Sequence, residues 1–198
     1  EARLVIVEQD FRPALGGLAA DLEARQRLVS AERWRVETQR AAPEAAPHAA
    51  RAEDPAFWLY SSGTTGRPKG IVHTHRSLLP SGQAQREVLG LGPGDRIFAT
   101  SKLFFAYSLE NGLLGPLALG ATAILNPDWA DLEQIESVLE RHAPTALFSV
   151  PTFYRRLLAL PAERLARFRD VRRHVSAGER LPEPVFEAWR QATGREIL

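Results

Sequence analysis

Residues 60–70 read Tyr-Ser-Ser-Gly-Thr-Thr-Gly-Arg-Pro-Lys-Gly and join two short apolar segments with the composition of β-strands. Gly63 and Gly66 allow backbone N–H groups to approach an anion closely, and the hydroxyl side chains around them add donors in a row. Lys69 adds a mobile positive charge, because a lysine ammonium is a compact point charge on a flexible stem. The loop therefore predicts a polyphosphate site between two strands.

This loop differs from two common phosphate-binding motifs. A Walker A loop needs Gly-Lys-Ser/Thr, whereas Lys69 follows Pro68 and precedes Gly70. A dinucleotide-binding loop needs the G-x-G-x-x-G spacing, which Gly63 and Gly66 do not have. A solvated turn is the plain alternative for any glycine-rich loop, but the ordered run from Ser61 to Gly70 argues against it.

Outward from this loop, short apolar runs alternate with helical patterns. Strands are expected at Leu4–Val7, Phe57–Tyr60 (buried), Ile71–His75, Arg96–Thr100, Thr122–Asn126, Ala146–Val150 and Arg172–Ser176. Helices are expected at Pro13–Leu28, at Arg76–Leu89 with a break near Pro80–Gly82, and at Leu132–His142. Asp131 and Gln134 resemble a capping box at the start of the last helix, and Pro144 prevents its continuation. Strands spaced by helices predict an α/β fold, with a largely parallel sheet and helices on both faces.

The composition is that of an ordinary globular domain, with 198 residues, 44% hydrophobic residues and a net charge of +1. No apolar run approaches the ~20 residues that span a bilayer, and the near-neutral charge argues against a nucleic-acid binder. The chain has no cysteine, which excludes disulfides and favours a reducing cytoplasm. Residues 41–55 are rich in Ala and Pro and predict a surface loop, which we expect to connect parts of one domain rather than two domains.

Lysine use is skewed. Of the 25 basic residues only Lys69 and Lys102 are lysines, so the other 23 are arginines. A chain of this kind uses Arg wherever any positive charge will serve, and the two side chains are not equivalent. The lysine at position 69 therefore indicates a site that needs a point charge. Lys102 indicates such a site more weakly.

Ser61–Gly70 resembles the phosphate-loop motif of the adenylate-forming superfamily, which includes acyl- and aryl-CoA ligases, luciferases and peptide-synthetase adenylation domains. Further segments also resemble that superfamily: Asp54–Tyr60 and Ile71–His75 its flanking strands, Leu103–Asn111 its acyl-pocket border, and Ser149–Tyr154 and Val175–Pro182 two later pocket segments. The set is most similar to benzoate-CoA ligases, over roughly residues 54–198. The resemblance implies part of the large N-terminal domain of such an enzyme.

The resemblance also implies the site. Its phosphate-binding positions fall on Ser61, Ser62, Gly63, Thr64, Thr65, Gly66 and Lys69, with Thr65 and Lys69 expected to act in catalysis. Ala106 and Tyr107 match positions that flank the aryl group, and Ala177, Gly178 and Glu179 match a segment lining the nucleotide and substrate cleft. A small aromatic carboxylate would attack the α-phosphorus of MgATP to give acyl-AMP and pyrophosphate. The thiol of coenzyme A would then displace AMP.

Other assignments stay open. A fatty-acyl-CoA ligase or a peptide-synthetase adenylation domain would share the loop, although Ala106 beside Tyr107 favours a small flat acid. A non-catalytic nucleotide-binding module is the alternative of another class. The family's Thr-Glu motif for Mg²⁺, its ribose-binding Asp and its C-terminal domain with a catalytic Lys are not found up to Leu198. We therefore expect an internal fragment, inactive alone, whose unpaired sheet edges favour self-association into a homo-oligomer.

Two further patterns are expected to be structural. His73 and His75 alternate on a predicted strand, as metal ligands do, but the sequence offers no third ligand nearby. The seven arginines between Arg155 and Arg173 are expected to form a solvated helical face rather than a site for CoA phosphates or nucleic acid.

Overall fold

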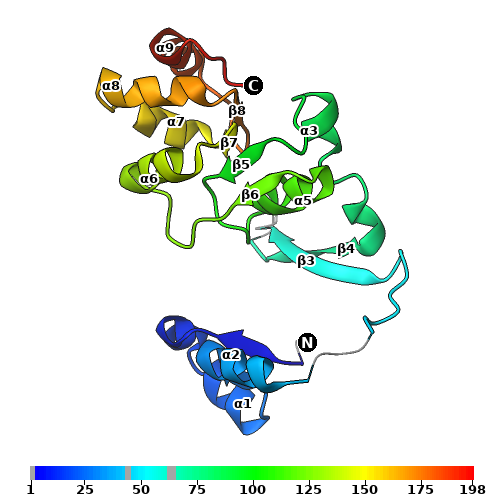
Figure 1. Ribbon diagram of the computed structural model, residues 1–198. Helices are drawn as coiled ribbons and strands as arrows, with labels where there is room; N and C mark the ends of the chain where they lie inside the picture. The colour runs from blue at the N-terminus through cyan, green and yellow to red at the C-terminus, as the bar shows by residue number, and fades with distance from the viewer. Residues whose placement is uncertain (1–2, 43–45, 62–65) are drawn as a thin grey trace. The chain divides into compact units, whose positions relative to one another are not determined.

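The computed structural model describes residues 3–42, 46–61 and 66–198 (Figure 1). Within it the chain divides into two compact units, Glu1–Ala49 and Ala50–Leu198. The division falls inside the Ala/Pro-rich segment 41–55. The described residues of that segment up to Arg51 are exposed and belong to no helix or strand.

The first unit has two short parallel strands and helices around them. Its elements are β1 (Val5–Val7), the 3-10 helix η1 (Gln9–Leu15), α1 (Leu18–Ala24), β2 (Leu28–Ser30) and α2 (Ala31–Arg40). The strand expected at Leu4–Val7 is confirmed, but the single helix expected over Pro13–Leu28 is wrong. Gly16 has φ 52° and ends η1, since this left-handed conformation suits glycine. Leu28 instead pairs with Val5 in the sheet.

The strands β3 (Pro55–Ser61) and β4 (Lys69–Thr74) form a two-stranded antiparallel hairpin. A strand forms at Phe57–Tyr60 as expected, but the prediction that it is buried is wrong. Trp58 and Tyr60 are 53% and 74% exposed. A two-stranded hairpin has no second layer of its own to cover its faces. His73 stacks on Phe57 with ring centroids 4.7 Å apart, which is a structural role, and His75 already lies in the 3-10 helix η2 (His75–Leu78).

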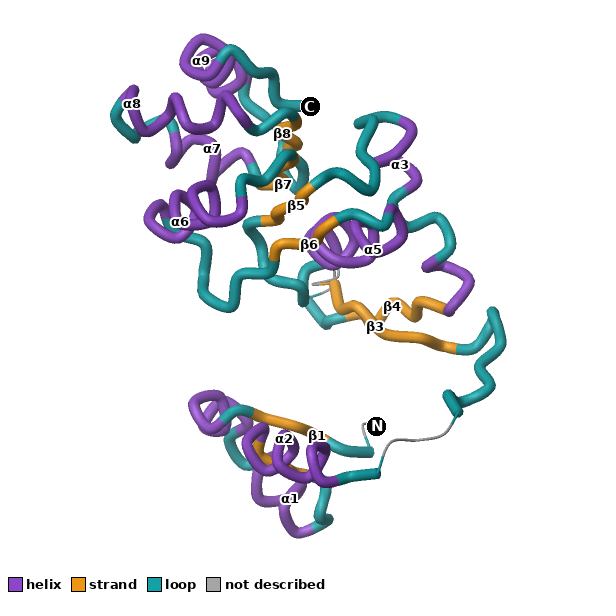
Figure 2. Tube along the Cα trace, viewed as in Figure 1, coloured by secondary structure: helices purple, strands orange, loops and turns teal. Residues whose placement is uncertain are grey.

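The second unit is built on a four-stranded parallel sheet with the order β6-β5-β7-β8 (Figure 2). Its strands are β5 (Arg96–Ala99), β6 (Thr122–Ile124), β7 (Ala146–Ser149) and β8 (Arg173–Ser176), all within the predicted ranges. Alternate residues enter two different cores. Phe98 and Leu147 pack with the larger cluster, whereas Ile97, Ala146 and Phe148 pack with the smaller one. The predicted α/β fold with helices on both faces of a parallel sheet is confirmed.

The remaining helices cover these two faces. They are α3 (Gln83–Glu87), α4 (Ala106–Leu109), the π-helix η3 (Glu110–Leu114), α5 (Gly115–Leu119), α6 (Leu132–His142), α7 (Pro151–Leu157), α8 (Ala162–Leu165), the 3-10 helix η4 (Ala166–Asp170) and α9 (Glu183–Thr193). The larger core takes side chains from α6, α7 and α9, and the smaller core takes Leu119 from α5. None of the described helices is long and apolar enough to cross a membrane.

Local signals explain the bounds of α6 and the break that precedes α3. Helix α6 has the predicted bounds, because Asp131 Oδ1 accepts a hydrogen bond from the N–H of Gln134 at 2.8 Å and Ala143 leaves the helix at φ 42°. The predicted break at Pro80–Gly82 is also confirmed. Gly82 has φ 78°, and a Cβ there would lie 2.8 Å from the carbonyl oxygen of Gly115. Only glycine fits this turn.

Three of the seven arginines in the arginine-rich stretch form ion pairs, and two of these pairs show its role. Arg164 pairs with Glu136, and Arg172 pairs with Asp95 at 2.7 Å. Burial raises the pKa of Asp95, but hydrogen bonds from Thr145, Arg172 and Gly92 outweigh it, so its pKa lies below the ordinary value. The first pair joins α8 to α6, and the second joins the residues that precede β8 and β5, so both are structural contacts, although Arg172 lies outside the helices.

Candidate functional site

The carboxyl ends of β5 and β7 meet at the topological switch point of the sheet. The chain leaves β5 for β6 on one side, and leaves β7 for β8 on the other. Open α/β sheets bind ligands in the crevice at such a point. Here the hydroxyls of Thr100 and Ser149 lie 2.7 Å apart, and the N–H of Thr100 donates to the carbonyl of Phe148 at 3.0 Å. The two strand ends are therefore tied together by both backbone and side chain.

Tyr107 reaches this edge from α4. Its ring meets that of Phe148 edge-on at 6.3 Å, and its hydroxyl donates to the carbonyl of Val175 at 3.4 Å. Burial raises the pKa of Tyr107 well above its ordinary value, so the phenol stays neutral at physiological pH. The amide Nδ2 of Asn111 donates to the carbonyl of Tyr107 at 2.8 Å and anchors the helix that carries it. Ala106, one position earlier, is exposed.

The segment after β8 comes to the same edge. The N–H of Ala177 donates to the carbonyl of Ser149 at 3.3 Å, and Gly178 turns the chain with φ 87°. The hydroxyl of Thr152 is shared between the two carboxylate oxygens of Glu179, at 2.9 and 3.0 Å. The structure thus brings Tyr107 to Val175, two residues before Ala177, although the two are far apart in the sequence.

The phosphate loop is described in part. Ser61 and Lys69 pair across the end of the β3–β4 hairpin, and Gly66 has φ 76°. Ser62, Gly63, Thr64 and Thr65 lie outside the described residues. Gly70 packs against Tyr60, where a Cβ would lie 3.3 Å from the ring. Lys69 is exposed. The hairpin register therefore places a hydroxyl and an ammonium-bearing residue at the two ends of the loop.

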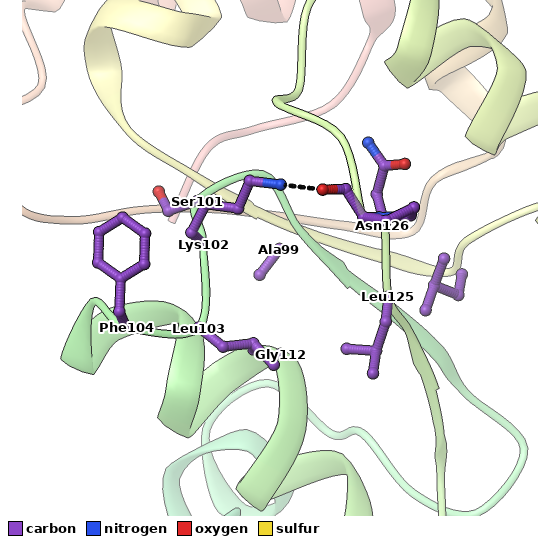
Figure 3. Close-up of a pocket in the computed structure, with 10 residues that line it drawn as sticks. Ala99, Ser101, Lys102, Leu103, Phe104, Gly112, Leu125 and Asn126 are labelled. Carbon is purple, nitrogen blue, oxygen red and sulfur yellow. Dashed lines mark hydrogen bonds between the residues drawn. The ribbon is translucent and has the colours of Figure 1, made fainter. Parts of the chain in front are cut away.

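A cavity of about 400 Å³, which sequence reasoning missed, lies beside β5 and β6 (Figure 3). Its lining is mostly apolar: Ala99, Leu103, Phe104, Gly112, Ile124, Leu125 and Pro127, with Ser101, Lys102 and Asn126 as polar members. The signals in the sequence were that Lys102 is one of two lysines and that Leu103–Asn111, which supplies Leu103 and Phe104 to the lining, resembles an acyl-pocket border. The cavity could not be found without the structure, because the pairing of β5 with β6 brings its two walls together.

Metal binding receives no support from the described part of the chain. Among those residues no group of three or more His, Cys, Asp or Glu side chains could hold an ion. A Mg²⁺ ion that enters with ATP would be held mainly by the phosphates rather than by such a cluster.

A family model described as AMP-binding enzyme matches residues 1–198. The chain belongs to the AMP-binding enzyme family. It is 50% identical over 145 residues to a 3-hydroxybenzoate–CoA/4-hydroxybenzoate–CoA ligase of Thauera aromatica, covering 73% of this chain and 28% of that protein. It is 38% identical over 205 residues to a benzoate–CoA ligase of the same organism, covering 100% of this chain and 38% of the relative. The resemblance to benzoate-CoA ligases is thereby confirmed.

Solved structures agree with this AMP-binding assignment. An anthranilate CoA ligase in complex with anthranoyl-AMP superposes with a TM-score of 0.87 at 32% identity, covering 99% of this chain and 40% of that one. A benzoate CoA ligase from Burkholderia xenovorans has a TM-score of 0.79 at 35% identity, with the same coverage. The chain thus spans between 28% and 40% of the length of these relatives.

Proposed function

We propose that the protein containing this chain is an ATP-dependent aryl-acid CoA ligase of the benzoate type. The observation that carries the proposal is the contact of Tyr107 with Val175, just before the Ala177–Glu179 turn, at the switch point of the sheet. An aromatic side chain beside a glycine turn suits a flat acid and its adenylate. The identity to hydroxybenzoate- and benzoate-CoA ligases supports the same substrate class.

The reaction has two steps. A carboxylate oxygen of the acid attacks the α-phosphorus of ATP, the new P–O bond forms, and the bond to the bridging oxygen breaks to release pyrophosphate. The sulfur of coenzyme A then attacks the acyl carbon of the adenylate, its thiol proton is lost to solvent or a base, and AMP leaves. Both steps develop charge on phosphate oxygens, so donors fixed around them lower the barrier.

Different residues of this chain are proposed to contact different parts of the substrates. Donors to the β- and γ-phosphates are proposed to come from Ser61, Ser62, Gly63, Thr64, Thr65, Gly66 and Lys69. Ala106 and Tyr107 would border the aryl ring, and Ala177, Gly178 and Glu179 would line the cleft between nucleotide and acid. Mg²⁺, when bound with ATP, would neutralise phosphate charge. The absence of cysteine fits a reducing compartment, and we place the protein in the cytoplasm.

A pyrophosphate-release screen of the full-length protein tests the proposal. Aryl acids and straight-chain fatty acids are compared with ATP present, with and without coenzyme A. We expect release with small aryl acids, and an aryl-CoA product only when coenzyme A is added. A preference for fatty acids would indicate a fatty-acyl-CoA ligase, and adenylate without thioester a peptide-synthetase type. Nucleotide binding without release for any acid would indicate the non-catalytic module.

A further inference from the structure

Lys102 joins the loop after β5 to the loop after β6. Its Nζ donates to the carbonyl of Pro127 at 2.5 Å and lies 5.4 Å from the ring centroid of Trp129. Figure 3 shows the side chain extending across the cavity toward the opposite wall, with the hydrogen bond at its end. One ammonium group thus contacts a backbone oxygen and an aromatic face of the same neighbouring loop.

A second contact joins the same loops. The rings of Phe104 and Trp129 meet edge-on at 6.3 Å, and Phe104 also contacts Phe105 at 4.5 Å. The strand pairing between β5 and β6 ends at Phe98 and Ile124, so the contact between the two loops beyond that point rests on side chains. Phe104 and Trp129 are 65% and 66% exposed, which makes them weak supports on their own.

The loop that Lys102 holds leads directly into the proposed acid pocket. Its first residue, Thr100, is bonded to Phe148, and the N–H of Phe105 donates to the carbonyl of Lys102 at 3.0 Å just before α4 begins. Beneath the loop lies the cavity of about 400 Å³ rather than packed side chains. The segment that leads into α4 is therefore held from the side by Lys102, whereas Tyr107 itself is held from within by Phe148 and Val175.

We propose that Lys102 is a positioning residue that sets the acid pocket by fastening the start of α4 to the loop after β6. This inference rests on the proposed function, in which Ala106 and Tyr107 border the aryl ring. It also accounts for a lysine in an arginine-rich chain. A point charge can meet the carbonyl of Pro127 and the ring of Trp129 with one nitrogen, whereas the planar fork of Arg is wider.

Steady-state kinetics of the full-length enzyme test the link to the acid. In Lys102→Met the KM for the aryl acid should rise roughly tenfold, since a charge-assisted hydrogen bond and a cation–π contact are lost. The KM for ATP should stay unchanged, and Lys102→Arg should lie closer to the wild type than Lys102→Met. Arg86→Met, at an exposed basic residue of α3, is the matched control. An unchanged KM for the acid in Lys102→Met would overturn the inference.

A double-mutant cycle and hydrogen exchange separate positioning from general stability. If Lys102 acts with Trp129, the effects of Lys102→Met and Trp129→Leu on kcat/KM for the acid should be less than multiplicative when combined. Backbone amides of residues 101–109 and 125–131 should exchange faster in Lys102→Met than in Arg86→Met, whether or not the enzyme activates aryl acids. Unchanged exchange in both segments would refute the fastening. A wild type that activates no aryl acid would refute the proposed function alone.

Discussion

Lys69 stands exposed at the first position of β4, where its backbone pairs with Ser61. A side-chain replacement leaves this pairing intact, so folding and chemistry can be separated here. In the full-length enzyme Lys69→Ala should slow adenylation roughly 10²–10³-fold, because one charged contact to the departing pyrophosphate contributes about 2–4 kcal/mol. Lys69→Arg should also slow it, since a planar fork replaces a point charge. Single-turnover formation of acyl-AMP measures both.

Arg67→Ala provides the control for Lys69, because it removes a basic side chain from the same loop two positions earlier. All three variants should keep the melting temperature of the wild type. Wild-type rates in both Lys69 variants, at saturating acid and ATP, would remove Lys69 from the site.

Ala106 and Tyr107 should decide which acid is accepted. Ala106→Phe should exclude aryl acids by filling the pocket while ATP binding persists. Tyr107→Ala should raise the KM for the acid roughly fivefold, because an aromatic contact contributes about 1 kcal/mol. Leu117→Ala, an exposed apolar residue of α5, is the matched control. The measurement is the KM for acid and for ATP in each variant, and a change confined to ATP would place both residues on the wrong side of the cleft.

His174 should make the fold sensitive to acid. It is fully buried among Tyr154, Phe168 and Trp189, and its Nδ1 has no hydrogen-bond partner among the residues that the structure describes. Burial lowers the pKa of His174 from its ordinary 6.5 to about 4. Above pH 6.5 the ring is neutral in both folded and unfolded chains. Between pH 6.5 and about 4 only the unfolded chain takes up the proton, so the free energy of unfolding falls as the pH falls.

Because one pKa unit corresponds to about 1.4 kcal/mol, this loss should approach about 3 kcal/mol near pH 4. Urea denaturation at pH 7.5, 5.5 and 4.5 measures the free energy of unfolding at each pH. His174→Phe should lose part of this pH dependence, whereas the exposed His48→Gln should keep it. Equal pH dependence in the wild type and in His174→Phe would show that other groups carry the acid sensitivity.

At the scale of elements, helix α6 depends on a single side-chain cap. Asp131 accepts the N–H of Gln134, and Ile135 and Val138 from the same helix enter the larger core. Asp131→Ala should lower the free energy of unfolding by about 1 kcal/mol, as losses of such caps typically do. Asp131→Asn retains an oxygen acceptor and should cost much less. Chemical denaturation compares the two, and equal losses would mean that charge rather than capping stabilises the helix end.

The whole chain is much shorter than the relatives to which it is similar. It spans at most 40% of the relatives cited above. We expect residues 1–198 in isolation to form no acyl-AMP and to bind ATP with a Kd on the order of 1 mM or weaker, because phosphate donors alone leave most of the nucleotide without contacts. Isothermal titration and a radiolabelled adenylation assay measure this, with the full-length protein as control. Micromolar binding or turnover would show a self-sufficient site.

The same isolated chain should self-associate. Trp58, Tyr60 and Val72 are each more than half exposed on the β3–β4 hairpin, and Trp58 pairs directly with Val72. Exposed apolar side chains grouped in this way favour association. Sedimentation velocity should show a molecular mass that rises with concentration, and Trp58→Ser should reduce the effect. A monomer at all concentrations would contradict the expectation of a homo-oligomer.

Local chemistry determined what the sequence could show by itself. The bounds of α6 follow from Asp131 and Pro144, the break at Gly82 from a backbone that only glycine fits, and the phosphate-loop motif from an ordered run of neighbouring residues. The four parallel strands were also found from their apolar runs. Each of these signals lies within a few residues of the feature that it predicts.

Tertiary structure decided the remaining features of the fold and the site, because these features depend on which distant segments pair. The order β6-β5-β7-β8 brings Tyr107 to Val175 and places Thr100 against Ser149, and no local pattern encodes that order. The exposure of Trp58 follows from a hairpin with one partner strand, which an apolar run cannot reveal. Lys102 was conspicuous in the sequence only by its rarity. Its contact with Pro127 exists because β5 and β6 are neighbours in the sheet.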